Sequence, residues 1–126
     1  MENRYDVGME LMKKSMGKEG EQTLNNFGRD FEDIGKYIIE FVFADLGTRG
    51  ILKTREREMI TIVSLISQGD TASQLKMHYK SALKAGMDKK ELIEVILQCI
   101  PHVGFPKVLN AVQIAQGVLN QSEYEN

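Results

Sequence analysis

Residues 54–80 read TREREMITIVSLISQGDTASQLKMHYK, and this stretch decides the fold. Its first half distributes apolar side chains almost all round one helix, which is typical of a central, buried helix. We expect Thr54 to cap that helix. The pair Gly69-Asp70 then interrupts the pattern, and Thr71 is the expected N-cap of a second helix. The stretch therefore predicts two consecutive helices, the first of them at the centre of the protein.

Helical spacing continues on both sides, without strand-like alternation, so the predicted fold is all-α. We expect one domain over residues 1–126, a helical bundle of about six to seven helices. The expected outer helices are residues 4–16 ending at Gly17, residues 21–27, a longer helix capped by Asp30, a helix after Gly86 that starts with the Asp88–Glu91 capping-box spacing, and a final helix with Pro106 in its first turn.

Composition excludes several classes of protein. The net charge of −2 and the absence of a basic run argue against nucleic acid as a partner. No apolar run approaches the roughly 18 residues that would suggest a membrane span, and charged residues within 1–16 are unlike a signal peptide. The single cysteine, Cys99, cannot form an internal disulfide. We therefore expect a cytoplasmic protein.

Glu58 and Arg57 are the unusual residues of the central helix. Glu58 shares a stripe with core-type side chains, so its carboxylate is either paired, hydrogen-bonded or protonated there, or it leans into solvent and stabilises the helix dipole. Arg57 begins a polar stripe that either lines a cavity or faces solvent; in a cavity it would bind a substrate carboxylate with two hydrogen bonds. That polar stripe comprises Arg57, Thr61, Ser64 and Gln68.

His78 is expected to point inward, opposite a face of lysines. It is either a hydrogen-bonded core residue or a group that transfers protons near neutral pH. His102 lies in an irregular segment in which Gly104 indicates an unusual backbone dihedral or a close backbone approach. Two histidines and Cys99, far apart in sequence, do not have the spacing of metal ligands, and we expect Cys99 to be a small buried hydrophobe.

The chain resembles the carboxymuconolactone decarboxylase family over nearly its whole length. The resemblance rests on residues 55–62 (REREMITI), 78–86 (HYKSALKAG), 91–95 (ELIEV) and 104–106 (GFP), with further matches at residues 5–8, 16–17 and 43–49. Two departures fall near the expected pocket. Family members have tyrosine where this chain has His102, and they have a tryptophan-containing loop, whereas this chain has no Trp.

The resemblance implies a compact all-α subunit that assembles into a homohexamer. The adjacent Phe41, Val42 and Phe43 independently indicate association, because one helix cannot direct all three inward. The same superfamily contains alkylhydroperoxidase D-like proteins with a Cys-x-x-Cys pair, whose positions are Thr71 and Gln74 here. Thiol peroxidase chemistry needs a thiolate and a resolving thiol, so we do not expect it in this chain.

The resemblance implies decarboxylation of 4-carboxymuconolactone to the 3-oxoadipate enol-lactone without a cofactor or metal. His78 would be the general acid or oxyanion donor, Glu58 would set its protonation, and Arg57 would hold the carboxylate. The other residues expected to contact the substrate are Arg49, Gln74, His102 and Gly104. The alternatives are a hydroperoxidase-like, non-enzymatic or redox-support protein that lacks the cysteine pair, and an enzyme that acts on another small acid.

Overall fold

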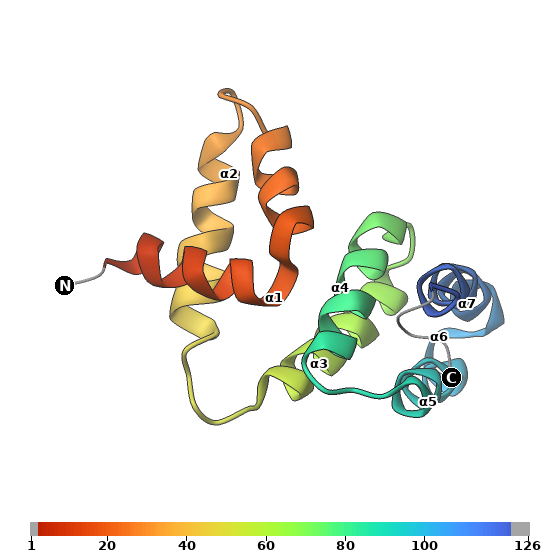
Figure 1. Ribbon diagram of the computed structural model, residues 1–126. Coiled ribbons are helices and arrows are strands. Elements are labelled where there is room, and N and C mark those ends of the chain that lie inside the picture. The colour runs from red at the N-terminus through yellow and green to blue at the C-terminus, as the bar shows by residue number, and fades with distance from the viewer. Residues whose placement is uncertain (1–2, 122–126) are drawn as a thin grey trace. The chain divides into compact units, whose positions relative to one another are not determined.

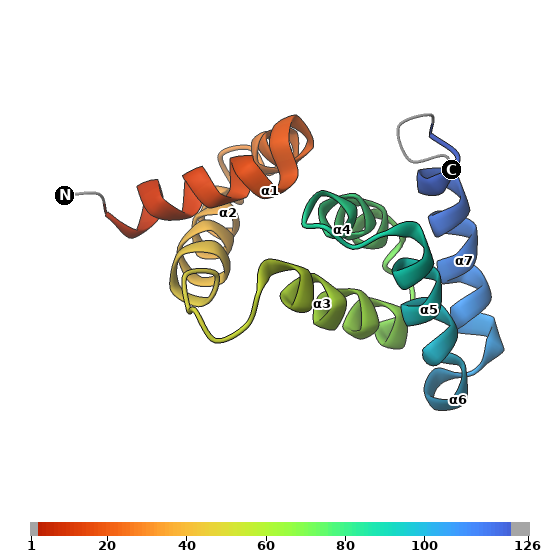
Figure 2. The same ribbon diagram turned by 60° about the horizontal axis from the view of Figure 1, so that its bottom comes forward.

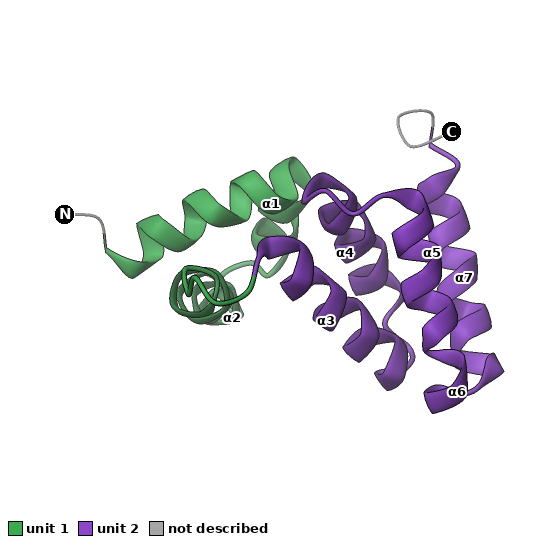
Figure 3. Ribbon diagram, turned by 90° about the horizontal axis from the view of Figure 1, so that it is seen from below, with its two compact units in different colours: residues 1–52 green, residues 53–126 purple. Residues whose placement is uncertain are grey.

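The computed structural model describes residues 3–121, and every regular element in that range is helical (Figure 1). The all-α prediction is confirmed. The packing divides the chain into two compact units, residues 1–52 and residues 53–126 (Figure 3). The helices are α1 (Arg4–Asn26), α2 (Glu32–Tyr37), the π-helix η1 (Ile38–Leu46), α3 (Thr54–Gln68), α4 (Ala72–Lys84), α5 (Lys89–Gln98), α6 (Ile100–Val103) and α7 (Phe105–Leu119).

In the first unit, α1 consists of two arms that meet at Gly17. This glycine has φ 58° and ψ −142°, a conformation that a side chain with a Cβ rarely adopts. Figure 1 shows the sharp change of direction between the arms. The predicted break is therefore confirmed. The sequence suggested that the second arm begins at residue 21, but it begins directly after the glycine.

The first arm of α1 packs closely against η1. Gly8 is buried, and a Cβ at this position would collide with the backbone carbonyl of Ile39. At the start of the same arm, Arg4 forms a bidentate ion pair with Asp45. Its Nε donates to Oδ1 at 3.0 Å and its Nη2 donates to Oδ2 at 2.6 Å. This hydrogen-bonded carboxylate raises the pKa of Arg4. The helix contact thus has a close backbone approach near its middle and a charged pair at its edge.

The helix expected after Asp30 differs from the prediction in two ways. Its N-terminal flanking residue is Phe31, which makes no side-chain capping bond, so the prediction that Asp30 is the N-cap was wrong. From Ile38 onward the helix widens into a π-helix, and the backbone N–H of Gly47 donates to the carbonyl of Val42 five residues earlier, at 3.0 Å. Such wide turns are rare, and sequence periodicity gave no sign of them.

The widening changes which residues of this helix are buried. The buried positions are Gly35, Ile39 and Ala44, so the spacing increases from four residues to five. In a regular α-helix the next inward position after Ile39 would be 42 or 43. Instead, Val42 is exposed and Phe43 is only half-buried, and the neighbouring Phe41 is exposed as well. The π-helix therefore turns large apolar side chains out of the core of its own unit.

The second unit is built around one apolar core that α3, α4, α5 and α7 enclose. Figure 2 shows α5 and α7 running alongside each other. Tyr79 is fully buried, and its hydroxyl donates to the carbonyl of Ala111 at 3.0 Å, which joins α4 to α7. No helix within residues 3–121 is long and apolar enough to cross a membrane.

Local signals at the ends of these helices had mixed outcomes. Lys53, not Thr54, is the N-cap of α3, and Thr71 donates its hydroxyl to the Leu65 carbonyl at 2.7 Å. The Thr54 cap was therefore wrong, whereas Thr71 does occupy the N-cap position of α4 but makes no side-chain capping bond there. The capping box at Asp88 is confirmed, because its carboxylate accepts from the backbone of Glu91 at 2.8 Å. Gly86 and Pro106 lie where the sequence placed them.

Substituting alanine at two glycines tests the packing of α1 on η1. Gly8→Ala should lower the free energy of unfolding by about 1–3 kcal/mol, because the added methyl group meets backbone that cannot move aside. Gly117→Ala is the matched control in α7, where nothing lies within 4 Å of an added Cβ. There alanine should stabilise the helix by up to about 1 kcal/mol. Chemical unfolding followed by circular dichroism measures the free energy of unfolding of both variants. Equal changes in Gly8→Ala and Gly117→Ala would contradict the close contact between α1 and η1.

Candidate functional site

Glu58 and His78 form a hydrogen-bonded pair between α3 and α4. Glu58 lies in the first turns of α3 and is only 8% exposed, and its Oε2 is 2.9 Å from Nδ1 of His78. The prediction of a buried, hydrogen-bonded Glu58 is therefore confirmed, and the alternative of a solvent-exposed Glu58 carboxylate is wrong. The His78 side chain remains 22% exposed. The pair thus combines a buried carboxylate with a partly exposed imidazole.

This arrangement gives the two ring nitrogens of His78 different tasks. Glu58 binds at Nδ1, so in the neutral ring the proton resides on Nδ1 and Nε2 is an acceptor. In the protonated ring Nε2–H becomes a donor, while the carboxylate faces the positive charge. A carboxylate that fixes the orientation and tautomer of a histidine is the arrangement used to position general acids and bases.

Arg57 precedes Glu58 in α3 and is half-buried. Within its stripe, the Thr61 hydroxyl donates to the Arg57 carbonyl at 3.0 Å, and Ser64 and Gln68 are exposed. The polar stripe therefore faces outward beyond the first turns of α3. Only its beginning, next to Glu58, remains partly enclosed.

The other expected substrate-binding residues lie in different places. Gln74 is exposed on α4, one turn before His78. Arg49 is exposed in the first unit, in the loop that follows η1. Gly104 separates α6 from α7 with φ 88°, so the unusual dihedral expected there is confirmed. The contribution of Arg49 to carboxylate binding stays a prediction.

His102 lies in a pocket whose lining does not include Arg57, Glu58 or His78. This pocket has a volume of about 460 Å³ and lies between α3, α5 and α6. The sequence did not predict this pocket, because its lining comes from helices that are far apart in the chain. The lining residues are Met59, Val63, Ser67, Glu91, Glu94, Val95, Gln98, Cys99, His102 and Val103.

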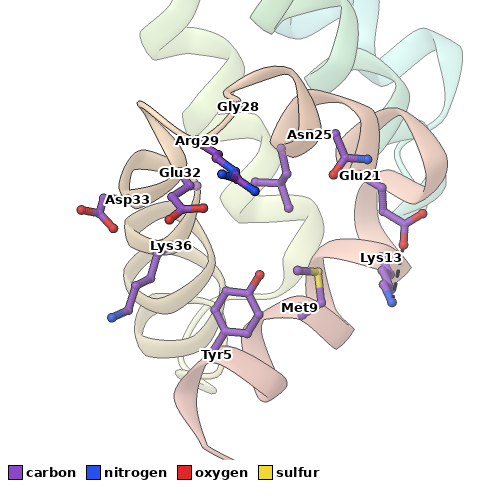
Figure 4. Close-up of a pocket in the computed structure, with 12 residues that line it drawn as sticks. Tyr5, Met9, Lys13, Glu21, Asn25, Gly28, Arg29, Glu32, Asp33 and Lys36 are labelled. Carbon is purple, nitrogen blue, oxygen red and sulfur yellow. Dashed lines mark ion pairs between the residues drawn. The ribbon is translucent and has the colours of Figure 1, made fainter.

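A larger hollow of about 780 Å³ lies in the first unit, between the two arms of α1 and the start of α2 (Figure 4). Its charged side chains balance, because Lys13, Arg29 and Lys36 accompany three acidic residues. Lys13 is moreover paired with Glu21 at 3.5 Å. This hollow therefore has no single charge preference. Among residues 3–121, no three His, Cys, Asp or Glu side chains gather in a group that could hold a metal ion.

Comparison with known proteins places this all-helical chain in a family. The chain belongs to the carboxymuconolactone decarboxylase family, whose model matches residues 32–117. It is 30% identical to a 4-carboxymuconolactone decarboxylase of Acinetobacter baylyi over 121 residues, which is 93% of this chain and 87% of that protein.

Two further relatives have been found. A nitrosuccinic acid decarboxylase of Metarhizium robertsii is 23% identical over 92% of this chain and 81% of its own length. An uncharacterised 15.0 kDa protein of Paracoccus denitrificans is 34% identical over 70% of this chain and 66% of its own length. The chain is therefore a decarboxylase-like member of the family, and two of these relatives carry the name of a decarboxylase.

The buried thiol of Cys99 should react slowly. Cys99 is 4% exposed, its Sγ donates to the Val95 carbonyl at 3.4 Å, and burial raises its pKa. At pH 8 the folded protein should therefore be alkylated by iodoacetamide on the order of tenfold more slowly than the unfolded chain, because less thiolate is present and access is restricted. With increasing pH, the alkylation rate of the folded protein should begin to rise later than that of the unfolded chain, because the pKa of the buried thiol is raised. Mass spectrometry measures the single adduct, and equal rates in both states would contradict this.

Proposed function

We propose that this protein is a cofactor-independent decarboxylase of small carboxylated lactones, with 4-carboxymuconolactone as the first substrate to test. The observation that carries the proposal is the Glu58–His78 hydrogen bond of 2.9 Å, next to a half-buried arginine in the same helix turn. The 4-carboxymuconolactone decarboxylase of Acinetobacter baylyi supports the substrate class, since it aligns over 93% of this chain.

The proposed reaction carries its own electron sink. The bond between the ring carbon and the departing carboxylate breaks, and carbon dioxide leaves. The electron pair moves through the ring double bond onto the lactone carbonyl oxygen. A proton then adds to the carbon next to that carbonyl, which gives the enol-lactone. Because the lactone itself holds the negative charge, the protein needs only to bind, to stabilise the oxyanion and to return a proton.

His78 would act through Nε2, the nitrogen opposite its bond to Glu58. In the protonated ring, Nε2–H can donate a hydrogen bond to the developing oxyanion and then give the proton to the substrate carbon. Glu58 would hold the ring in the required orientation and face the positive charge throughout. Glu58 is thus a positioning residue, and His78 is the catalytic residue.

Arg57 would hold the carboxylate of the substrate. Its planar guanidinium suits a carboxylate better than a lysine ammonium would, because two parallel hydrogen bonds fix both position and orientation. In the proposal, Arg49 and Gln74 contribute further contacts. His102 and Gly104 belong to the proposed substrate site only if the substrate also reaches the end of α6, where His102 lies.

The alternative, a hydroperoxidase-like or redox-support protein, has less support in the chain. Thr71 and Gln74 replace the required cysteine pair, and the Thr71 hydroxyl is bonded to the Leu65 carbonyl. The buried Cys99 is far from these positions in sequence. If hydroperoxide turnover with a dithiol were found, and if Cys99→Ser abolished it, the alternative would replace the decarboxylase proposal.

His78→Ala and Glu58→Gln test the pair directly. His78→Ala should lower turnover of 4-carboxymuconolactone about 10²–10⁴-fold, the usual contribution of a general acid. Glu58→Gln keeps the size of the side chain but removes its charge, so it should reduce kcat with little effect on KM. Lys76→Ala, at an exposed position of the same helix, is the control and should retain full activity.

A purely structural role for the pair gives a different result. The variants would then lose roughly 1–3 kcal/mol of stability through an unsatisfied buried group, while turnover by the folded fraction stayed at the wild-type level. Thermal unfolding and turnover are therefore measured on the same samples. Wild-type kcat in both His78→Ala and Glu58→Gln would eliminate the proposed roles.

We also propose a homo-oligomer, a hexamer as the family resemblance implies. An exposed apolar stripe along α2 and η1 supports this proposal, because monomeric proteins rarely leave such a surface in water. The stripe comprises Phe31, Ile34, Tyr37 and Phe41, at 59%, 43%, 64% and 55% exposure.

Light scattering tests the assembly. We expect a mass well above the 14.3 kDa of one chain at micromolar concentration. Phe41→Glu would place a charge in the interface and should shift the mass towards that of the monomer. Glu40→Gln, a neighbouring substitution at a half-buried position, should leave the mass unchanged. A monomeric wild-type protein would exclude the proposed hexamer.

A further inference from the structure

The pocket between α3, α5 and α6 has the construction of a small-molecule site. Three rows of side chains, each spaced by four residues, make up most of its lining, and the row on α3 extends about 12 Å along that helix. The α3 row forms one wall of the pocket, and an apolar row and a polar row that both run from α5 into α6 form the rest; these two rows are called the floor and the polar wall below. The rows are Met59–Val63–Ser67, Val95–Cys99–Val103 and Glu94–Gln98–His102.

The volume and the lining both indicate the size and polarity of the ligand. About 460 Å³ lies within the range of roughly 300–1,000 Å³ that ligand pockets have. The floor is apolar and partly buried, and Cys99, the middle residue of this row, is 4% exposed. Most of the hydrogen-bonding side chains, Glu91, Glu94, Gln98 and His102, belong to α5 and α6, and α3 contributes only Ser67, whose hydroxyl already donates to the Val63 carbonyl. A molecule with an apolar body and one polar edge would satisfy both surfaces.

The charged groups around the pocket disfavour an anion. Glu91 is neutralised by its ion pair with Arg55. Glu94, on the polar wall, adds a negative charge that none of the ion pairs found within residues 3–121 offsets. At the far end, the Lys107 ammonium is bonded to the Ser67 carbonyl at 2.8 Å. A carboxylate would therefore lie beside a carboxylate, which costs binding energy.

We propose that this pocket binds a small, uncharged, mostly apolar molecule with a hydrogen-bond donor, such as an aromatic alcohol, at a site separate from the Glu58–His78 pair. The hydroxyl of the ligand would donate to Glu94 or Gln98, and its ring would contact Val63, Val95 and Cys99. The proposal does not depend on the decarboxylation, because the lining of this pocket does not include Glu58 or His78.

Benzyl alcohol and benzoate are matched probes, since they share a ring and differ in charge. In a saturation-transfer NMR titration of the full-length protein, benzyl alcohol should bind saturably, and benzoate should bind about fivefold more weakly, the effect of one unit charge at contact in water. Glu94→Gln removes the negative charge from the pocket, so the affinities for benzyl alcohol and benzoate should become more similar. Because Cys99 is the single cysteine of the chain, slower alkylation in the presence of benzyl alcohol locates the ligand.

Two tryptophan substitutions on the same helix provide the structural test. Val63→Trp would fill the pocket and should weaken benzyl alcohol binding at least about tenfold. Ile60→Trp is the control, because Ile60 is also an exposed apolar residue of α3 but does not line the pocket. Gln98→Trp, on the opposite wall, repeats the test if Val63→Trp does not fold. His78→Ala should bind benzyl alcohol as the wild type does, even if its turnover is lost.

Several results would overturn the proposal. These are an absence of saturable benzyl alcohol binding at millimolar concentration, binding that survives both Val63→Trp and Gln98→Trp, and an equal loss in Ile60→Trp. A wild-type protein that binds neither probe, together with a Val63→Trp variant of altered mass in light scattering, would show that a second copy of the chain covers the pocket.

Discussion

Burial of the Glu58 carboxylate is the constraint on which the proposed site depends. An isolated charge removed from water costs more than any single helix contact returns, so the chain has to supply a partner at that position. His78 is that partner, and it lies on the next helix, 20 residues later. The bond therefore fixes how α3 and α4 face each other, and it also leaves one imidazole nitrogen for a substrate. One interaction serves both the packing and the proposed chemistry.

The features that sequence predicted correctly depend on one residue or on spacing within one helix. Gly17 needed a left-handed conformation, and the Asp88 capping box needed only residues three positions apart. The inward direction of Glu58 and His78 followed from the stripes they share with apolar side chains. The two helices are separated by the short Gly69–Thr71 connection, which brings those stripes together. Much of the central pair was therefore accessible from local pattern.

The features that sequence missed depend on contacts between elements. Thr71 was expected to cap α4, but its hydroxyl finds the Leu65 carbonyl at the end of α3 instead. The pocket between α3, α5 and α6 exists because α5 and α6 leave space beside α3, and the sequence of no single helix predicts that space. Cys99 was correctly expected to be buried. Its neighbours across the pocket, Met59 and Val63, belong to a helix about 40 positions earlier and could not be assigned from periodicity.

The π-helix has a consequence for how this chain tolerates a change in length. Between Ile39 and Ala44 it accommodates one residue more than an α-helix would place between two successive buried positions. Deletion of one residue in this segment would allow regular α-helical turns, whereas a substitution would leave the wide turns in place. After such a deletion Ala44 would follow Ile39 at the four-residue spacing of an α-helix, so Ala44 would still face inward and Asp45 would still face Arg4. In this segment the number of residues, more than their identity, sets which side chains face water.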